Sequence, residues 1–240
     1  MDRYKWSLLA VFLLAWAWAA FSPTYRESWL LENYLIFVLV PIIIVAGRYF
    51  KLSNFSYTLI TIFVLLHIAG AHYTYSEVPF GYTLQNWLGA SRNIYDRLAH
   101  FSFGFLLGYP LREVFMRLSK VKGFWAYYFP FDLTLALSAI YEIIEWTVVR
   151  VVDPTAGLAF LGIQGDIWDA QKDMLMAATG AALAMIITFL INWRFNRGLM
   201  TEFKESFQVA KGDRPLGEEK LREYLKEKAR PRRGNSQPHQ

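Results

Sequence analysis

The stretch MLMAATGAALAMIITFLINW, residues 174–193, decides the fold class because it carries no charged side chain. A helix of about 20 apolar residues, rising about 1.5 Å per residue, is long enough to cross the hydrocarbon core of a membrane. Further apolar runs lie at residues 6–21, 34–50, 55–75, 98–116 and 124–151. The sequence therefore predicts an all-α, polytopic transmembrane helical bundle of about six spans.

The composition supports a membrane protein. Of the 240 residues, 55% are hydrophobic and only 19% are charged, which is too little polar material to coat a soluble globule. The net charge of +5 does not indicate nucleic-acid binding, because lysine and arginine lie beside the apolar runs and in the C-terminal tail. The absence of cysteine excludes disulfides and thiolate chemistry. We expect a six-span domain at residues 1–198 and a polar, partly disordered cytoplasmic tail at 199–240.

Basic residues in short loops predict the orientation. They flank alternate ends of the apolar runs, and the positive-inside rule places them in the cytoplasm: Arg3, Lys5, Arg48, Lys51, Arg112, Arg117, Lys120, Lys122, Arg194 and Arg197. Both termini are then cytoplasmic, and residues 25–33, 76–97 and 153–172 lie outside. Ala17, Trp18 and Ala19 imitate a signal-peptidase site. The three tryptophans of this run favour a retained span, and cleavage stays open as the alternative. We predict a multi-pass protein of the inner membrane, with membrane lipid as a partner.

Ionisable side chains gather at the predicted outer face, although the orientation was derived without them. Asp96 and His100 are four residues apart, and Glu142 and Glu145 are three apart, so each pair shares one helical face. Buried charges are costly in a membrane, by roughly 2.5 to 3.5 kcal/mol each, so each needs a partner or a purpose. The wider set comes from four segments of the chain: His67, His72, Tyr75, Arg97, Gln164, Asp166, Asp169, Gln171, Lys172 and Asp173.

Imidazole and carboxylate are ligands of zinc, manganese and non-haem iron, and an acid pair beside a histidine also suits acid–base catalysis. We predict a divalent metal, zinc or manganese, held by residues from His67, His72, His100, Glu142, Glu145, Asp166, Asp169 and Asp173. The predicted catalytic residues are His100, Glu142, Glu145 and Asp169, and the predicted substrate-binding residues are Arg97, Tyr75 and Gln171. Spacings such as HExxH, CxxC, GxSxG or a P-loop are absent, so the ligand geometry is not fixed by a motif.

Each of these residues also has a structural interpretation. Arg97 can pair with Glu142, Glu145 or an aspartate and join neighbouring spans. Asp96 and Asp173 can cap helices or complement helix dipoles. His67 can be an interhelical hydrogen bonder, and Tyr75 a member of an interfacial aromatic belt.

Four segments resemble the YjdF-like family of inner-membrane proteins: HIAGAHYTYSEVPFG at 67–81, NIYDRLAHFSFGFLLG at 93–108, YEIIEW at 141–146 and GDIWDAQKDMLMAATGA at 165–181. The family brings no established activity with it. A more distant likeness is to VanZ-like membrane proteins, which share an acid-base-x-x-His-Phe start of a span, a glutamate-rich span and an aspartate before a small-residue helix. By that resemblance the matching positions are Asp96, Arg97, His100, Glu142, Glu145, Asp169 and Asp173, with arginine at 97 where the VanZ pattern has lysine.

Three functions remain open from the sequence. The first is a metal-dependent hydrolase or transferase acting on a lipid, lipid-linked or envelope substrate at the outer leaflet. The second is a proton- or ion-coupled transporter in which Glu142, Glu145 and His67 relay charge. The third is a non-catalytic assembly or envelope factor whose buried ion pairs hold the helices together. The oligomeric state is not predicted.

Overall fold

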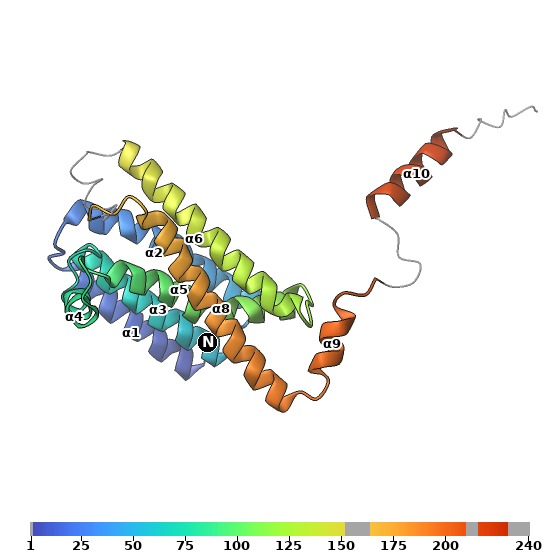
Figure 1. Cartoon of the computed structure of the whole chain (residues 1–240), viewed down its shortest axis with the longest axis horizontal. Coiled ribbons are helices and arrows are strands. Elements are labelled where there is room, and N and C mark those ends of the chain that lie inside the picture. Colours follow the sequence, from blue (N-terminus) through green and yellow to red (C-terminus); the bar gives the residue numbers. More distant parts are fainter. Residues whose placement is uncertain (1, 152–163, 210–215, 230–240) are drawn as a thin grey trace, which may run out of the picture. The chain divides into compact units, whose positions relative to one another are not determined.

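The computed structural model describes residues 2–151, 164–209 and 216–229, and these residues form helices and no strand. The chain divides into two units, Met1–Ser206 and Phe207–Gln240. The first unit holds α1 (Arg3–Ala20), α2 (Arg26–Tyr49), α3 (Asn54–Tyr73), α4 (Pro79–Leu88), α5 (Tyr95–Leu118), α6 (Trp125–Val151), α8 (Asp169–Phe195) and α9 (Leu199–Glu205), and the second holds α10 (Leu216–Ala229). The predicted all-α class is confirmed. In the first unit the long helices run side by side (Figure 1).

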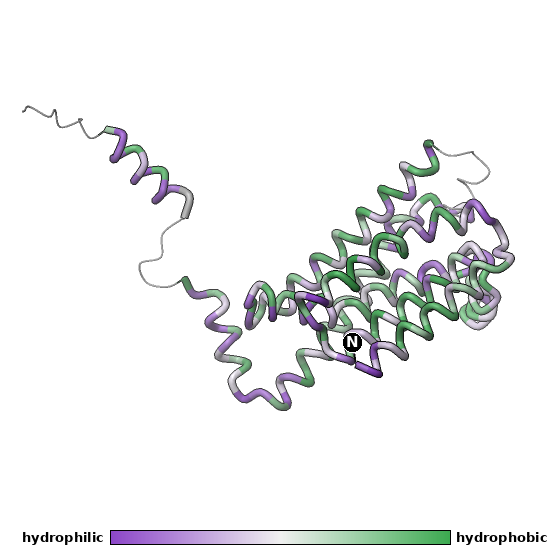
Figure 2. The backbone as a smooth tube through the Cα atoms, turned by 180° about the vertical axis from the view of Figure 1, so that it is seen from behind, coloured by the Kyte–Doolittle hydropathy of each residue, from purple (hydrophilic) through white to green (hydrophobic). Residues whose placement is uncertain are grey.

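Within the described residues, α2, α3 and α8 are long and apolar enough to cross a membrane. The apolar character of these helices is visible along the tube in Figure 2. Helix α5 carries Asp96, Arg97, Arg112, Glu113 and Arg117, and these charges lower its hydropathy although its 24 residues are long enough to span. Six spans with both ends in the cytoplasm therefore stay a prediction.

Each of the three predicted outer loops, 25–33, 76–97 and 153–172, contains helical residues, the last because α8 begins at Asp169. Helix α2 begins at Arg26 rather than at residue 34, so Glu32 lies inside a helix and not in an outer loop. Its side chain is buried together with its neighbour Asn33, which explains how the helix extends through polar residues. The predicted loop 76–97 contains the short helix α4, which has Pro79 in its first turn and ends at Gly89 with a left-handed backbone.

The most extensive helix contact joins α5 and α8, and two glycines make it possible. A Cβ atom at Gly104 would lie 1.9 Å from the carbonyl oxygen of Ala177, and one at Gly180 would lie 2.1 Å from that of Phe101. The two backbones are thus in direct contact, a mode of packing typical of small residues in membrane helices.

The same helix faces continue into the polar cluster. On α5, Asp96 and His100 lie at four-residue intervals from Gly104, and on α8 Asp169 and Asp173 lie at the same intervals from Ala177. Residues at this spacing share one helical face. The glycine contact therefore brings the acidic ends of α5 and α8 together.

The opposite ends of α3 and α5 are joined through Glu113. Its carboxylate accepts hydrogen bonds from the backbone N–H of Ser53 at 2.9 Å and from the hydroxyls of Ser53 and Ser56 at 2.8 and 2.6 Å, and it pairs with Arg117 at 2.6 Å. A carboxylate at the start of a helix satisfies N–H groups that have no partner within the helix. This contact fixes where α3 begins relative to α5.

Candidate functional site

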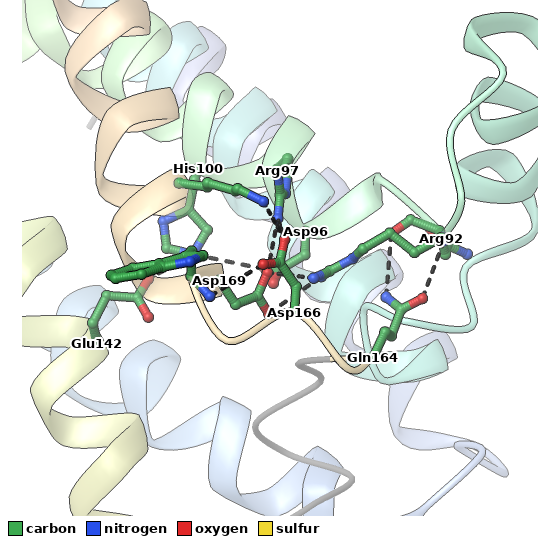
Figure 3. A network of polar contacts seen from close by, with 11 residues as sticks. Arg92, Asp96, Arg97, His100, Glu142, Gln164, Asp166 and Asp169 are labelled. Carbon is green, nitrogen blue, oxygen red and sulfur yellow. Dashed lines mark hydrogen bonds and ion pairs between the residues drawn. The ribbon is translucent and has the colours of Figure 1, made fainter.

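A layer of ion pairs links the start of α8 to α5 and to the loop before it (Figure 3). The Asp169 carboxylate, which is buried, pairs with the guanidinium groups of Arg92 and Arg97; the Arg97 Nη2 lies 3.1 Å from Asp169 Oδ1. The same Arg97 nitrogen donates to Asp166 Oδ2 at 2.7 Å, and the Lys172 amine donates to that oxygen at 2.7 Å. Two aspartates and three basic side chains thus hold these segments together.

Asp166 lies in the loop just before α8, where its charge is stabilised by its neighbours. The Lys172 amine, the backbone N–H of Trp168 and the Arg97 guanidinium hold the pKa of the Asp166 carboxyl well below its usual range. Its contribution to stability is therefore present above the ordinary aspartate pKa and is lost only as the pH falls through the lowered native value. At neutral pH the Asp166 carboxyl therefore stays charged.

A second group of side chains surrounds His100, one turn further along α5. The His100 Nε2 lies 3.4 Å from Glu142 Oε1 and 3.7 Å from Asp96 Oδ1, and its Nδ1 lies 3.5 Å from the Ser138 hydroxyl. Asp96, His100 and Asp173 each offer one ligand atom within 4.8 Å of the others. We call Asp96, His100, Glu142 and Asp173 the acid–histidine cluster.

The acid–histidine cluster suits a divalent cation for two reasons: its side chains are common metal ligands, and two of its buried oxygens have no hydrogen-bond partner within the described part of the chain. The buried side-chain atoms without a hydrogen-bond partner in the described residues include two oxygens of this cluster, Glu142 Oε1 and Asp173 Oδ1. A buried, unsatisfied polar atom in a native fold calls for an explanation such as an ion or a water molecule. Carboxylates and a neutral imidazole are ligand types of zinc and manganese.

A third group lies on the neighbouring helices and is centred on Glu32. The Glu32 carboxylate accepts a hydrogen bond from the Tyr141 hydroxyl at 2.9 Å. The His67 Nε2 lies 3.2 Å from the Glu32 backbone carbonyl, and the Tyr75 hydroxyl contacts His67 Nδ1. Because a carbonyl can only accept, the His67 proton resides on Nε2, and Nδ1 accepts from Tyr75. Both nitrogens of His67 are occupied by protein groups, and so is the hydroxyl of Tyr75.

The structure brings together some of the predicted site residues and separates others. Glu145 is an electrostatic neighbour of Asp96, Glu142 and Glu32, so it belongs with the acids. His72 lies apart, since its Nδ1 is 3.0 Å from the Ala19 carbonyl and its ring stacks on Trp18 at 4.5 Å. Gln171 is exposed on the first turn of α8 and does not point into the cluster's buried contacts. With 3.6 residues per turn, residues 169 and 173 share one face of α8, and residue 171 lies on the opposite face.

Three residues of the site were not anticipated. Glu32 precedes the apolar run that begins at Tyr34, so the sequence predicts it in an outer loop, although Trp29 and Asn33 continue the helical pattern around it. Arg92 precedes the predicted span, and nothing in its surroundings marked it. Asn93 exchanges hydrogen bonds with Gln164, from its backbone N–H at 3.1 Å and to its backbone carbonyl at 3.2 Å. This pairing holds the loop before α5 against the loop before α8.

The long apolar helices and the polar cluster buried among them define a multi-pass membrane protein. The chain belongs to the family described as "Predicted membrane protein (DUF2238)", whose model matches residues 4–194. It is 37% identical over 179 residues to the inner membrane protein YjdF of Escherichia coli (strain K12), an alignment that covers 73% of this chain and 85% of that protein. No solved structure matches the chain.

These comparisons confirm the predicted resemblance to YjdF and the predicted location, a multi-pass protein of the inner membrane. The likeness to VanZ-like proteins stays a prediction.

Proposed function

We propose that this protein is a metal-dependent enzyme of the membrane, and that Asp96, His100 and Asp173 hold its divalent cation. The observation that carries the proposal is the acid–histidine cluster, in which buried oxygens of Glu142 and Asp173 lack hydrogen-bond partners beside an imidazole. In the ion-pair layer, Arg92, Arg97 and Lys172 pair with Asp166 and Asp169, which leaves the acid–histidine cluster rich in carboxylates. A cation would compensate that excess of negative charge.

The residues around the cluster have distinct proposed roles. A divalent cation here would act as a Lewis acid toward a carbonyl or phosphoryl oxygen of the substrate. Glu142, 3.4 Å from His100, is positioned to accept a proton from an attacking group, and Glu145 supplies a second carboxylate nearby. The Ser138 hydroxyl, 3.5 Å from His100 Nδ1, would hold the imidazole in a fixed orientation toward the cation. Asp169 positions Arg97, whose charge can attract an anionic substrate group.

The surroundings of Glu142 and Glu145 favour a lipid, lipid-linked or envelope substrate. On α6 these acids alternate with Ile143, Ile144 and Trp146, which are apolar and exposed. Exposed apolar side chains on a membrane helix face lipid. A hydrophobic substrate could therefore reach the carboxylates from the bilayer without leaving it.

Metal content tests the proposal. We expect about one zinc or manganese ion per chain in protein purified in detergent without chelators, measured by elemental mass spectrometry. His100→Ala and Asp173→Asn remove a ligand each, and loss of one ligand should reduce the bound metal at least about tenfold. Metal added back should raise the melting temperature of the parent protein and not that of the variants.

The matched control is His72→Ala, because His72 is also buried but lies against Ala19 and Trp18. This control should keep its metal. Metal-free parent protein that gains no thermal stability from zinc or manganese would overturn the metal proposal, and so would equal metal loss in the control. All variants are compared only where they elute as a single species.

The active face of the proposed enzyme is extracytoplasmic, and the native chain offers a clean way to test this because it has no cysteine. We expect Glu77→Cys and Trp168→Cys to react with a membrane-impermeant maleimide in intact spheroplasts. Lys120→Cys and Lys204→Cys should react only after the membrane is opened. The reverse pattern would place the cluster on the cytoplasmic side and contradict the six-span orientation with both termini inside.

The ion pairs favour a second candidate function, a non-catalytic assembly or envelope factor. Asp169 and Asp166 are engaged with Arg92, Arg97 and Lys172, as expected if these charges only join helices. This account covers the ion-pair layer and leaves the unsatisfied oxygens of the acid–histidine cluster without a role. A folded, metal-free protein in the experiment above would favour it.

A further inference from the structure

A cleft of about 830 Å³ lies between α1, α2 and α3, at the ends of these helices that are remote from Glu32 and His67. Its volume is within the range of cavities that hold small-molecule ligands. Its walls are apolar and come from the first half of α1, the second half of α2 and the first half of α3: Leu9, Phe12, Val40, Ile43, Ile60 and Val64.

The cleft arises because α1 and α2 meet at one end only. There, the Trp16 indole donates to Asn33 Oδ1 at 2.7 Å, and Arg26 donates to the Ala20 carbonyl at 2.7 Å. Towards the other end α2 approaches α3 instead, where a Cβ atom at Gly47 would lie 3.3 Å from the Tyr57 hydroxyl. The apolar walls of the space between α1 and α2 favour apolar matter over water.

The mouth of the cleft is positively charged. Lys5, Arg48 and Lys51 line it together with a single carboxylate, that of Asp2. The Lys5 amine lies 3.4 Å from Asp2 Oδ2 and 4.9 Å from the centre of the Tyr57 ring, and its side chain is only 14% exposed. Arg48 and Lys51 are exposed. An apolar cleft with a basic mouth matches an amphiphile with an anionic head.

We propose that this cleft binds an anionic phospholipid, with its acyl chains between α1 and α2 and its phosphate at Arg48, Lys51 and Lys5. Basic pockets between membrane helices recognise anionic lipid heads in this way, and each lysine or arginine near the surface strengthens the attraction. The site is separate from the acid–histidine cluster, so the inference goes beyond the proposed enzymatic function.

Native mass spectrometry of the full, delipidated chain tests the site. Phosphatidylglycerol and phosphatidylcholine with identical acyl chains are added in turn, and the first should bind about tenfold more tightly. Combined replacement by Lys5→Gln, Arg48→Gln and Lys51→Gln should reduce that preference to less than about twofold. Lys120→Gln, Arg194→Gln and Arg197→Gln together remove three charges elsewhere and should preserve it.

A second variant tests the cleft independently of charge. Ile43→Trp places a large side chain in the apolar wall and should weaken binding of both lipids, while the ratio between them stays above about fivefold. Inorganic phosphate should not displace the lipid, because it lacks chains. Equal binding of the two lipids by the parent protein would show ordinary boundary lipid and overturn the proposal. Equal loss in the control triple variant, or displacement by inorganic phosphate, would do so as well.

Discussion

Gly180→Leu is expected to abolish the folded bundle, because α5 and α8 contact each other through their backbones. A Cβ atom alone at this position would lie 2.1 Å from the Phe101 carbonyl oxygen and 2.8 Å from the Phe105 nitrogen. Neither backbone can move aside without separating the two helices. Overpacking of a well-packed interior typically costs about 1 to 3 kcal/mol, and leucine at a backbone contact should exceed that range. The measurement is the monodisperse fraction and the apparent Tm of the purified protein in detergent.

The control for this prediction is the neighbouring residue on the same helix. Thr179 is exposed, and its hydroxyl bonds only to the Leu175 carbonyl of its own helix. Thr179→Leu adds comparable bulk to α8 and should change the Tm by less than about 2 °C. Gly180→Ala should fall between the two. A Gly180→Leu protein as stable as the control would show that the α5–α8 contact is looser than described.

Asp169→Asn is expected to have the second largest effect. The Asp169 carboxylate is 5% exposed and pairs with two arginines, of which Arg92 is 9% exposed. Removing one partner of a buried ion pair leaves uncompensated charge and typically costs about 3 to 5 kcal/mol. We expect the apparent Tm to fall by roughly 6 to 20 °C, since roughly 1 kcal/mol corresponds to 2 to 4 °C in a chain of this size.

Two variants locate the origin of that loss. Asp166→Asn removes a more exposed partner of the same Arg97 and should lower the Tm much less than Asp169→Asn does. A double variant, Asp169→Leu with Arg92→Leu, removes both buried charges and should recover part of the stability that the single change loses. If the double variant is no more stable than the sum of its single changes, the two charges do not act as a pair.

Much of the architecture was accessible without a structure because the bilayer imposes strong rules. Apolar runs such as 174–193 can only be helices, since every backbone group must be bonded within the segment when no water is present. The four-residue spacing of Asp96 and His100, and of Asp169 and Asp173, placed each pair on one helical face. The predicted gathering of acids and histidine at one end of the bundle follows from that spacing together with the orientation rule.

Helix boundaries and partners were less accessible, because polar residues inside a bundle look like loop residues in a sequence. The hydropathy pattern predicts Glu32 outside the membrane span, yet it is buried in α2 and accepts a hydrogen bond from Tyr141. His72 looks equivalent to His67 in spacing, but the two side chains point to different helices, one to Ala19 and the other to Glu32. Spacing fixes the face of a helix, whereas the neighbouring helix decides what that face meets.

The sequence by itself determined that the protein lies in a membrane, that it is helical and which family it resembles, because hydropathy and local periodicity act within single segments. Only the tertiary structure decided which acids are neutralised by arginine and which surround His100. That choice depends on the backbone contact at Gly104 and Gly180, which sets the register of α5 against α8. The register between two segments far apart in the chain cannot be predicted from the local composition of either one.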